Sequence, residues 1–318
     1  FSLLGCLEAY HLLRLKDTGL ERFFKRRGRW LALHHESGKL SNHEALIVYC
    51  LYLISQRFQE TGFLDFYHDR LNRLLSWQHD EGWFMEYNGC DLGYQTLSIA
   101  ILAQLYADSG EQKLRKPLKR AIAMTAQFMH PDGSFGGEIG SRNTYNYFPH
   151  GFELVGAWLP EALHLNNRFV VALEKGRTPC YEDDHMIAHH TWSYLLAARD
   201  HVSVRTAKSF SPKSRVFYEG AGLLVDRRNS MDLFVALNKG GVFKLFRDGE
   251  LIVSDTQISL KMRNGSTAVC HLIDNYSIKV SANYIEISGR AGWAKQRVMR
   301  PLDNILLRTS PSTRYSRS

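Results

Sequence analysis

The sequence predicts an α+β protein in two parts, with helices first and antiparallel strands after them. Up to about residue 201 the apolar residues recur at the spacing of amphipathic helices. From about residue 202 they fall into short runs of β-branched and aromatic residues, which are typical of strands. Such a change of period favours separate domains, so we place a helical domain over residues 1–201 and a β domain over 202–318.

The apolar spacing locates the helices of the first part. They are expected near residues 1–16, 42–60, 63–78, 92–108, 112–129, 151–165 and 184–200. One start is marked by Ser41–Glu44, which fits the S-x-x-E capping box and puts Asn42 and His43 in the first helical turn. The basic segments 23–29 and 312–318 can be explained as solvated segments.

Strands are expected in five runs of the second part, residues 215–226, 231–238, 242–255, 267–273 and 276–289. Between or within these runs stand residue pairs that tolerate the positive φ of tight hairpin turns. They are found in 238–241, at Asp248-Gly249 and at Asn264-Gly265. Successive hairpins of this kind make an antiparallel sheet or a sandwich.

A weak internal repeat runs through the helical part. Four landmark pairs are each separated by 51 positions: Gly82 and Gly133, Phe84 and Phe135, Tyr94 and Tyr145, Gln95 and Asn146. One repeat is a helix, a glycine-rich loop with aromatic residues, and a second helix. Helix pairs of this kind stack as a solenoid or close into an (α/α) toroid. In a toroid the loops meet at one cavity, which would bring Asn42 and His43 close to residues 140–153.

Composition limits the function classes. With 44% hydrophobic and 23% charged residues the chain is globular, and its richest apolar run, 45–55, is shorter than the roughly 18 residues of a membrane span. Five scattered cysteines without a C-x-x-C pair argue against a disulfide framework or a zinc site. The net charge of +8 favours an acidic partner, which can be nucleic acid, an anionic membrane surface or an acidic polysaccharide. Because residues 1–16 already have helical spacing, we expect the true N-terminus and any signal peptide to be missing.

Several stretches resemble a known family: residues 40–46 (LSNHEAL), the two repeat loops, residues 142–151 (RNTYNYFPHG) and residues 216–238. They are similar to polysaccharide lyases of the heparinase II/III-like, alginate lyase and chondroitin lyase groups. This resemblance implies an incomplete (α/α) toroid followed by an antiparallel β-sandwich. It also implies β-elimination of an acidic, uronate-containing polysaccharide, with no nucleic acid as partner, no cofactor, and a periplasmic or secreted location. The loops also resemble those of terpene cyclases, but the D-x-D-D and D-D-x-x-D motifs of those enzymes are absent.

A uronate lyase needs a group that neutralises the carboxylate, a base for the C5 proton and an acid for the departing O4 oxygen. The resemblance implies that the neutralising amide stands at a helix start, where Asn42 and His43 lie. Arg142 is suited to clamp a carboxylate, because its planar fork binds both oxygens. The residues expected to act in catalysis are Tyr147, His150, Asn42, His43 and Asn146. Those expected to bind substrate are Arg142, Tyr94, Gln95, Tyr145, His189, His190 and Glu153.

Simpler explanations exist for several of these residues. Tyr147 and Phe148 fit equally well as core aromatics beside Pro149. His185 and His189, with Asp183 or Asp184, have the spacing of metal ligands, but acidic residues at a helix start are explained by the helix dipole. We therefore predict no metal site.

Two other functions remain open at this level. A glycoside hydrolase would need a pair of carboxylates, for which Glu86, Glu138, Asp91 and Glu153 are candidates. A non-catalytic protein of polysaccharide synthesis or export would only bind an acidic glycan. The oligomeric state is not indicated by the sequence.

Overall fold

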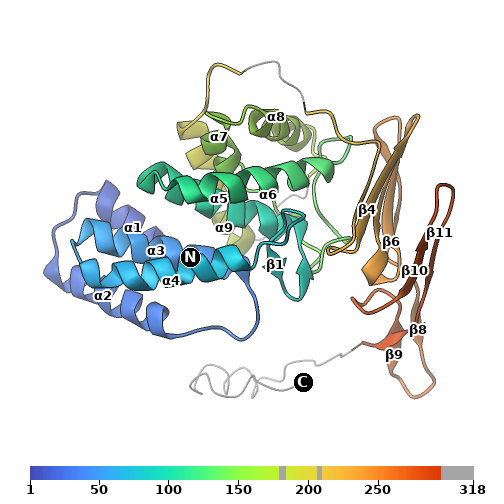
Figure 1. Ribbon diagram of the computed structural model, residues 1–318, viewed down its shortest axis with the longest axis horizontal. Helices are drawn as coiled ribbons and strands as arrows, with labels where there is room; N and C mark the ends of the chain where they lie inside the picture. The colour runs from blue at the N-terminus through green and yellow to red at the C-terminus, as the bar shows by residue number, and fades with distance from the viewer. Residues whose placement is uncertain (179–183, 206–209, 295–318) are drawn as a thin grey trace.

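Helices make up the first part of the chain and antiparallel strands the last part, so the α+β prediction is confirmed (Figure 1). The computed structural model describes residues 1–178, 184–205 and 210–294, without the side chains of residues 184–189. The helices are α1 (Ser2–Leu12), α2 (Thr18–Leu33), α3 (Ser41–Arg57), α4 (Leu64–Ser76), α5 (Leu92–Ser109), α6 (Arg115–Gln127), α7 (His150–Gly156), α8 (Glu161–Glu174) and α9 (Asp184–Arg199).

The helices are arranged in two rows. Helices α3, α5, α7 and α9 contact one another in succession, whereas α4, α6 and α8 each pack on the helix that precedes them. Helix α5, in the first row, buries every residue from Leu92 to Leu105 except Tyr94. Helix α4, in the second row, buries one face only, through Tyr67, Arg70, Leu71 and Leu74. This is the burial expected of an enclosed row and a solvent-facing row.

Helix α2 is missed by the apolar spacing because its apolar stripe is narrow. Asp17 caps this helix, and its side chain accepts a hydrogen bond from the backbone N–H of Leu20 at 2.8 Å. The buried residues of the helix are Phe24, Gly28 and Ala32, one per turn. The basic segment 23–29 is therefore part of a helix, with its arginines on the exposed side.

Two further details of the helical part differ from expectation. Residues 151–165 form α7 and the beginning of α8 rather than one helix, because Pro160 lacks the N–H that a continuous helix would need. The capping box at Ser41 does not form, since the Ser41 hydroxyl donates to the Met85 carbonyl at 2.6 Å. The Glu44 carboxylate instead accepts a hydrogen bond from Arg70 at 2.8 Å. Asn42 and His43 do lie in the first turn of α3, as predicted.

The largest sheet of the described chain has five antiparallel strands in the order β3-β4-β5-β6-β7. They are β3 (Arg215–Tyr218), β4 (Leu223–Arg228), β5 (Met231–Ala236), β6 (Val242–Arg247) and β7 (Glu250–Asp255). Residues with positive φ stand at the predicted turn positions, which are Gly240, Gly241, Asp248, Gly249 and Gly265. Each of the five predicted runs contains one or two strands, whereas the short strands at residues 259–261 and 292–293 were not predicted.

Two smaller sheets lie on the side of the five-stranded sheet that faces away from the helices (Figure 1). One is the hairpin of β10 (Ser277–Val280) and β11 (Ile285–Ser288), and the other joins β8 (Ser259–Lys261), β9 (Thr267–Val269) and β12 (Gly292–Trp293). A small second core fills the space between the hairpin and the large sheet. Its residues include Leu224, Val235 and Leu237, with Ile278 and Ile287 packed against them.

The two repeat loops have the same local structure. Gly82 and Gly133 both have positive φ, at 105° and 85°. A Cβ at either position would lie 2.5 Å from a backbone oxygen, that of Arg120 in the first loop and that of Arg168 in the second. Each arginine also donates a hydrogen bond at 2.7 Å to the histidine carbonyl three residues before the glycine. The repeat seen in the sequence is therefore a structural repeat, and only glycine fits its turn.

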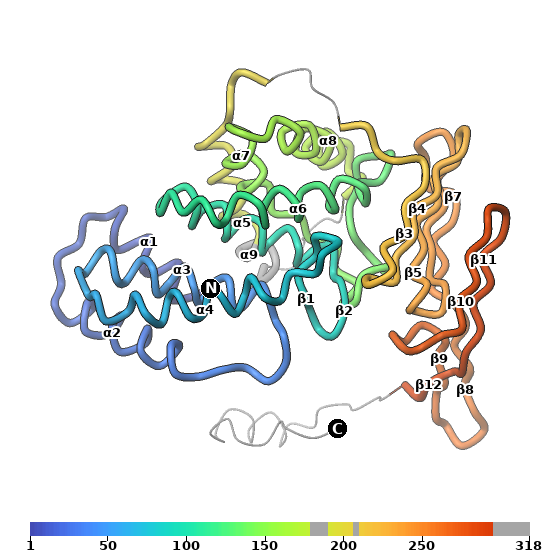
Figure 2. The backbone as a smooth tube through the Cα atoms, in the orientation of Figure 1, coloured from blue at the N-terminus to red at the C-terminus, as the bar shows by residue number. Residues whose placement is uncertain are grey.

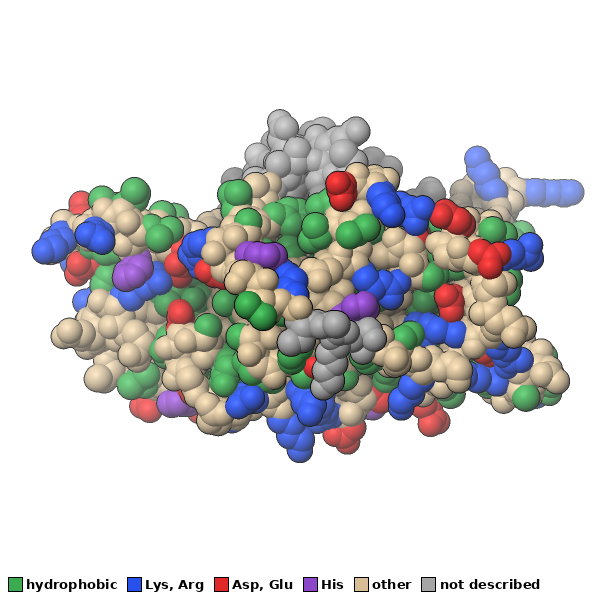
Figure 3. Space-filling model, turned by 90° about the horizontal axis from the view of Figure 1, so that it is seen from above, with side chains coloured by type: hydrophobic (Ala, Val, Ile, Leu, Met, Phe, Trp, Pro, Cys, Tyr) green, Lys and Arg blue, Asp and Glu red, His purple; other side chains and the backbone are tan. Residues whose placement is uncertain are grey.

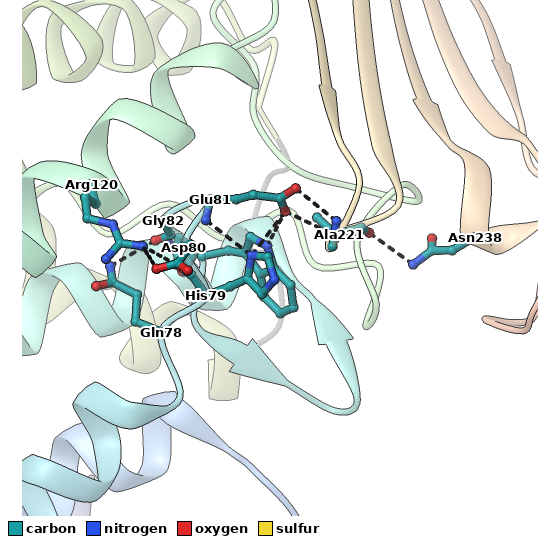
Figure 4. Close-up of polar contacts among 11 residues, drawn as sticks. Gln78, His79, Asp80, Glu81, Gly82, Arg120, Ala221 and Asn238 are labelled. Carbon is teal, nitrogen blue, oxygen red and sulfur yellow. Dashed lines mark hydrogen bonds and ion pairs between the residues drawn. The ribbon is translucent and has the colours of Figure 1, made fainter. Parts of the chain in front are cut away.

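These loops join the helices to the sheet. In the first loop the Glu81 carboxylate accepts hydrogen bonds from the backbone N–H groups of Gly220 and Ala221, at 2.9 and 3.0 Å (Figure 4). In the second loop His130 is completely buried, with its ring 4.9 Å from that of Phe234 and 5.0 Å from that of Phe246. The main core continues from the helices into the sheet. The boundary near residues 200–212 thus separates two parts that share one core.

Candidate functional site at the β1–β2 hairpin

A short hairpin, β1 (Met85–Glu86) and β2 (Gly89–Cys90), lies between the helices and the five-stranded sheet (Figure 2). Its turn residues Tyr87 and Asn88 have φ of 51° and 63°, as the tight two-residue hairpin turn requires. A Cβ on Gly89 would lie 3.0 Å from the Ser141 Cβ, so the hairpin packs closely on the loop that carries Arg142.

Asn42 and Glu86 lie side by side at the start of α3. The backbone N–H of Asn42 donates to the Glu86 carboxylate at 3.2 Å, and the two residues are 1% and 2% exposed. The two polar atoms of the Asn42 side chain and Glu86 Oε1 make no hydrogen bond of good geometry among the described residues, but the Asn42 amide is close enough to the Glu86 carboxylate to lower its pKa. Unsatisfied buried groups of this kind are uncommon, and they are found where a ligand or a water binds.

Burial raises the pKa of Glu86 to about 7, although the side-chain amide and the backbone N–H of Asn42 both act in the opposite direction. Its carboxyl group therefore exchanges protons near neutral pH. A group with such a pKa is suited to general acid–base chemistry.

Tyr94, Tyr87 and Arg142 form the outer part of the site. The Arg142 guanidinium lies 4.2 Å from the centre of the Tyr87 ring, and the Tyr87 and Tyr94 rings are 6.2 Å apart. Arg142 is exposed and both tyrosines are half-buried. Burial raises the pKa of Tyr94, while the charge of Arg142 opposes that rise. The phenol of Tyr94 consequently stays protonated at neutral pH.

Asp91 holds these residues together. As the N-cap of α5 it accepts a hydrogen bond from the Tyr94 N–H at 3.0 Å. Its second oxygen accepts from the Arg142 N–H at 2.8 Å, and the Thr144 hydroxyl donates to the first oxygen. On the other side of the loop the Ser141 hydroxyl donates to the Glu86 carbonyl at 2.8 Å. The start of α5, the hairpin and the Arg142 loop are thus fixed to one another.

The structure accordingly places three of the predicted residues, Asn42, Tyr94 and Arg142, in one small region. His43 is next to Asn42, but its ring pairs with Glu36 at 2.7 Å on the surface. Gln95 is buried and has a structural role, because its side-chain oxygen accepts from the Phe84 N–H at 3.0 Å.

The second repeat unit supplies Tyr145 and Asn146. The Tyr145 hydroxyl donates to the Glu138 carboxylate, and Asn146 is buried at the end of the Arg142 loop. These two residues therefore flank the loop rather than the hairpin.

Tyr147 lies in an aromatic stack away from solvent. It is 0% exposed, with its ring 4.7 Å from that of Phe152 and 4.1 Å from that of Phe169. Burial raises the pKa of its phenol well above the usual value. A polysaccharide cannot reach a phenol in this position, so the structure does not place Tyr147 with the exposed residues of the site.

His150 and Glu153 belong to a second polar cluster, between α7 and α9. The His150 ring bonds to the Asp200 carboxylate at 2.7 Å, and burial lowers the pKa of His150 while Asp200 opposes that change. Glu153 is 2% exposed and accepts a hydrogen bond from Arg205 at 2.6 Å. These contacts tie the end of α9 to α7, which is a structural role.

Two predicted histidines lie in α9 itself. His190 is buried, with its ring 4.7 Å from that of Phe148. The side chain of His189 lies outside the described part of the chain, and so do the other side chains of residues 183–189 whose spacing is that of metal ligands.

The carboxylates named for glycoside hydrolysis are engaged elsewhere, apart from Glu86. Burial alone would raise the pKa of Glu138, but the hydrogen bonds from Tyr145 and Lys244 bring it below the usual value. Asp91 is a helix cap, and Glu153 is paired with Arg205. The described structure therefore gives Glu86 no second carboxylate that is available for catalysis.

Charge is spread widely over the surface. On the face seen in Figure 3, Lys and Arg side chains cover both the helical and the sheet parts, with Asp and Glu between them.

A groove of about 850 Å³ lies beside the hairpin, lined by residues of the β part that include Phe217, Glu219 and Ile273. The groove is next to the hairpin, because its lining residue Ile273 lies 3.3 Å from the position that a Cβ on Gly89 would take. Among the described helices, none has the length and apolar character to cross a bilayer.

Sequence reasoning missed two members of this region. Tyr87 was not considered, although Asn88-Gly89 is a hairpin signal of the same kind as those used for the sheet. His271 was also missed; it lies in the loop that carries Ile273, and its Nδ1 is buried without a hydrogen-bond partner among the described residues. No signal in the sequence connects His271 with the helical part.

Comparison of the chain with known protein families and with curated proteins found no match.

Proposed function

We propose that this protein is a lyase that cleaves an acidic, uronate-containing polysaccharide by β-elimination at the β1–β2 hairpin. The observation that carries this proposal is the Asn42 amide, buried beside Glu86 in the hairpin whose turn residue Tyr87 contacts the exposed Arg142 guanidinium and the half-buried Tyr94 ring. These are the groups that a uronate lyase needs: donors for the carboxylate, and proton carriers for C5 and O4.

The architecture that goes with this proposal is an incomplete (α/α) toroid followed by a β-sandwich. The two rows of helices support the toroid, because alternate helices contact one another and the remaining helices pack outside them. The small core between the five-stranded sheet and the β10–β11 hairpin supports the sandwich. The resemblance to heparinase II/III-like and alginate lyases agrees with both.

Each residue receives one role in the proposed reaction. Arg142 binds the uronate carboxylate, and Asn42 donates to it as negative charge develops. Asn42 and Glu86 are 1% and 2% exposed, so in the proposed reaction the hairpin has to shift as the substrate binds. Glu86 then accepts the C5 proton through a water, because its pKa is about 7. The C4–O4 bond breaks as the C4–C5 double bond forms, and the protonated Tyr94 donates to the departing O4 oxygen. A proton passed from Glu86 to Tyr94 restores both groups.

An absorbance screen tests the reaction. The protein is incubated with alginate, heparan sulfate, hyaluronan and pectate, and the ultraviolet absorbance of a 4,5-unsaturated uronate is followed. We expect one substrate to respond, with Tyr94→Phe about 10²–10⁴-fold slower. Tyr147→Phe is the matched control and should change the rate little, because that phenol is buried.

The other outcomes identify the alternatives. New reducing ends without absorbance would indicate a glycoside hydrolase. Salt-sensitive binding without either product would indicate an acidic-glycan-binding protein. A Tyr147→Phe variant slower than Tyr94→Phe would contradict the site.

A further inference from the structure

Lys239 reaches from the sheet into the helical part and is almost completely enclosed. It ends η3 (Leu237–Lys239), the turn that follows β5, and is 5% exposed. The next residue, Gly240, has φ of 65°, and a Cβ there would collide with the Cys270 carbonyl. The chain reversal is therefore fixed in a form that directs Lys239 at the helical part.

The Lys239 ammonium bonds to three acceptors on one loop. It donates to the carbonyl oxygens of Glu138 and Gly140, both at 2.7 Å, and to the side-chain oxygen of Asn143. A lysine ammonium has three donors, so all of them are used. An enclosed ammonium placed in this way costs desolvation free energy, which three charge-assisted hydrogen bonds offset.

The same loop carries Arg142. Its backbone has few regular hydrogen bonds of its own: the Gly140 N–H bonds to Gly137 and the Asn143 N–H to Gly140. The Arg142 N–H is held by Asp91 on the helical side. Lys239 provides the matching support from the sheet.

We propose that Lys239 is a positioning residue, which holds the loop 138–143 in the conformation that presents Arg142 to an acidic ligand. This inference rests on the proposed function for the identity of the ligand. It adds that the sheet takes part in shaping a site whose chemical groups come from the helical part.

The loop's order should also depend on pH. Burial lowers the pKa of Lys239 to about 8, although the carboxylates of Asp91 and Glu138 act in the opposite direction. Lys244, on β6, pairs with the same Glu138 carboxylate at 3.1 Å. A folded-state pKa below the unfolded value means that the ammonium stabilises the fold less as the pH falls. Between about pH 8 and the unfolded value of 10.5 the neutral amine therefore favours the closed loop, even though it has one donor fewer than the ammonium.

Hydrogen exchange tests the proposal without any ligand. Four successive N–H groups of the loop, from Gly140 to Asn143, are hydrogen-bonded, so their exchange reports on its order. In Lys239→Met we expect their exchange to be roughly tenfold faster. Asn143→Gly, which removes one acceptor and tolerates the φ of 59°, should give a smaller increase. Lys279→Met, at an exposed lysine of β10, is the control and should change nothing.

The pH dependence gives a readout that a purely structural role would not move. Relative to an unstructured peptide of the same sequence, the wild-type loop should become better protected as the pH rises from about 8 to 10.5, and Lys239→Met should lose this rise. Unchanged protection in both Lys239→Met and Asn143→Gly would overturn the proposal.

Binding separates this inference from the proposed function. Alginate and heparan sulfate oligosaccharides are titrated into each variant, and we expect Lys239→Met to weaken binding roughly tenfold. Equal binding by Lys239→Met with a loosened loop would also overturn the proposal. If neither oligosaccharide binds the wild type, the acidic ligand of the proposed function is wrong, and loop exchange alone decides the role of Lys239.

Discussion

At the scale of single residues, accessibility decides which polar groups can act on a substrate. Tyr94 and Tyr147 carry the same phenol, but one is half-buried next to Arg142 and the other is enclosed by Phe152 and Phe169. The sequence around each residue, Gly93-Tyr94-Gln95 and Asn146-Tyr147-Phe148, does not distinguish the half-buried phenol from the fully buried one. The place of Asn42 in the first turn of a helix was predicted correctly, because the Ser41–Glu44 pattern marks a helix start and α3 begins there.

Glu86 should make the stability of the protein depend on pH. Its folded-state pKa is raised to about 7 by burial, so the folded state holds a proton that the unfolded state has released. The stabilisation is complete below the unfolded pKa of about 4.5 and is lost as the pH rises through 7. We expect wild type to lose up to about 3 kcal/mol over this range relative to Glu86→Gln, which mimics the protonated form.

Urea unfolding at a series of pH values measures this difference. Glu286→Gln, at an exposed glutamate of β11, is the control and should run parallel to the wild type. Parallel curves for wild type and Glu86→Gln would show that Glu86 does not keep its proton.

At the scale of elements, short-range signals predicted most of the fold. Tight-turn residue pairs marked the points where strands of the sheet end, because each pair has only a few permitted conformations. The β1–β2 hairpin was not predicted, because its strands are two residues long and carry no apolar alternation. Helix α2 was not predicted, because one buried residue per turn is a weak pattern among arginines and lysines. The meeting of the hairpin, α3 and α5 depends on tertiary contacts, which one sequence does not reveal.

The repeat loops can be tested through their glycines. Gly82→Ala and Gly133→Ala should each destabilise the fold by about 2–4 kcal/mol, because the methyl group meets a backbone oxygen as well as an unfavourable φ. Gly110→Ala is the matched control: its φ is 67°, but no atom lies within 4 Å of the new methyl. It should cost only about 1 kcal/mol. Chemical denaturation measures all three, and equal losses would argue against the close approach in the loops.

At the scale of the whole molecule, helices and sheet behave as one body because the main core passes through both. The connection near residues 200–212 is where the periodicity changes, yet the packing does not stop there. Sequence reasoning located the change of element type correctly and had no means of detecting the shared core.

Glu81 gives a measure of this coupling. Its carboxylate binds two N–H groups of the sheet and the Trp83 indole, so Glu81→Ala should lower stability by about 2–3 kcal/mol. Its neighbour Asp80 is fully exposed and pairs only with Arg120 among the described residues, so Asp80→Ala should cost less than about 0.5 kcal/mol. Thermal unfolding followed by circular dichroism compares them. Similar losses in both would mean that Glu81 does not join the two parts.

The burial of His130 between Phe234 and Phe246 limits the conditions under which the two parts stay together. Burial lowers its pKa well below the usual value, so the folded protein keeps a neutral imidazole where the unfolded chain would be charged. Stability from this group is present above about pH 6.5 and declines as the medium becomes more acidic. Glu86 acts in the opposite sense over a neighbouring range. Acid therefore weakens the contact between helices and sheet at His130, whereas the hairpin loses its stabilisation from Glu86 as the pH rises from about 4.5 through 7, so a change of pH in this range acts on the two regions in opposite directions.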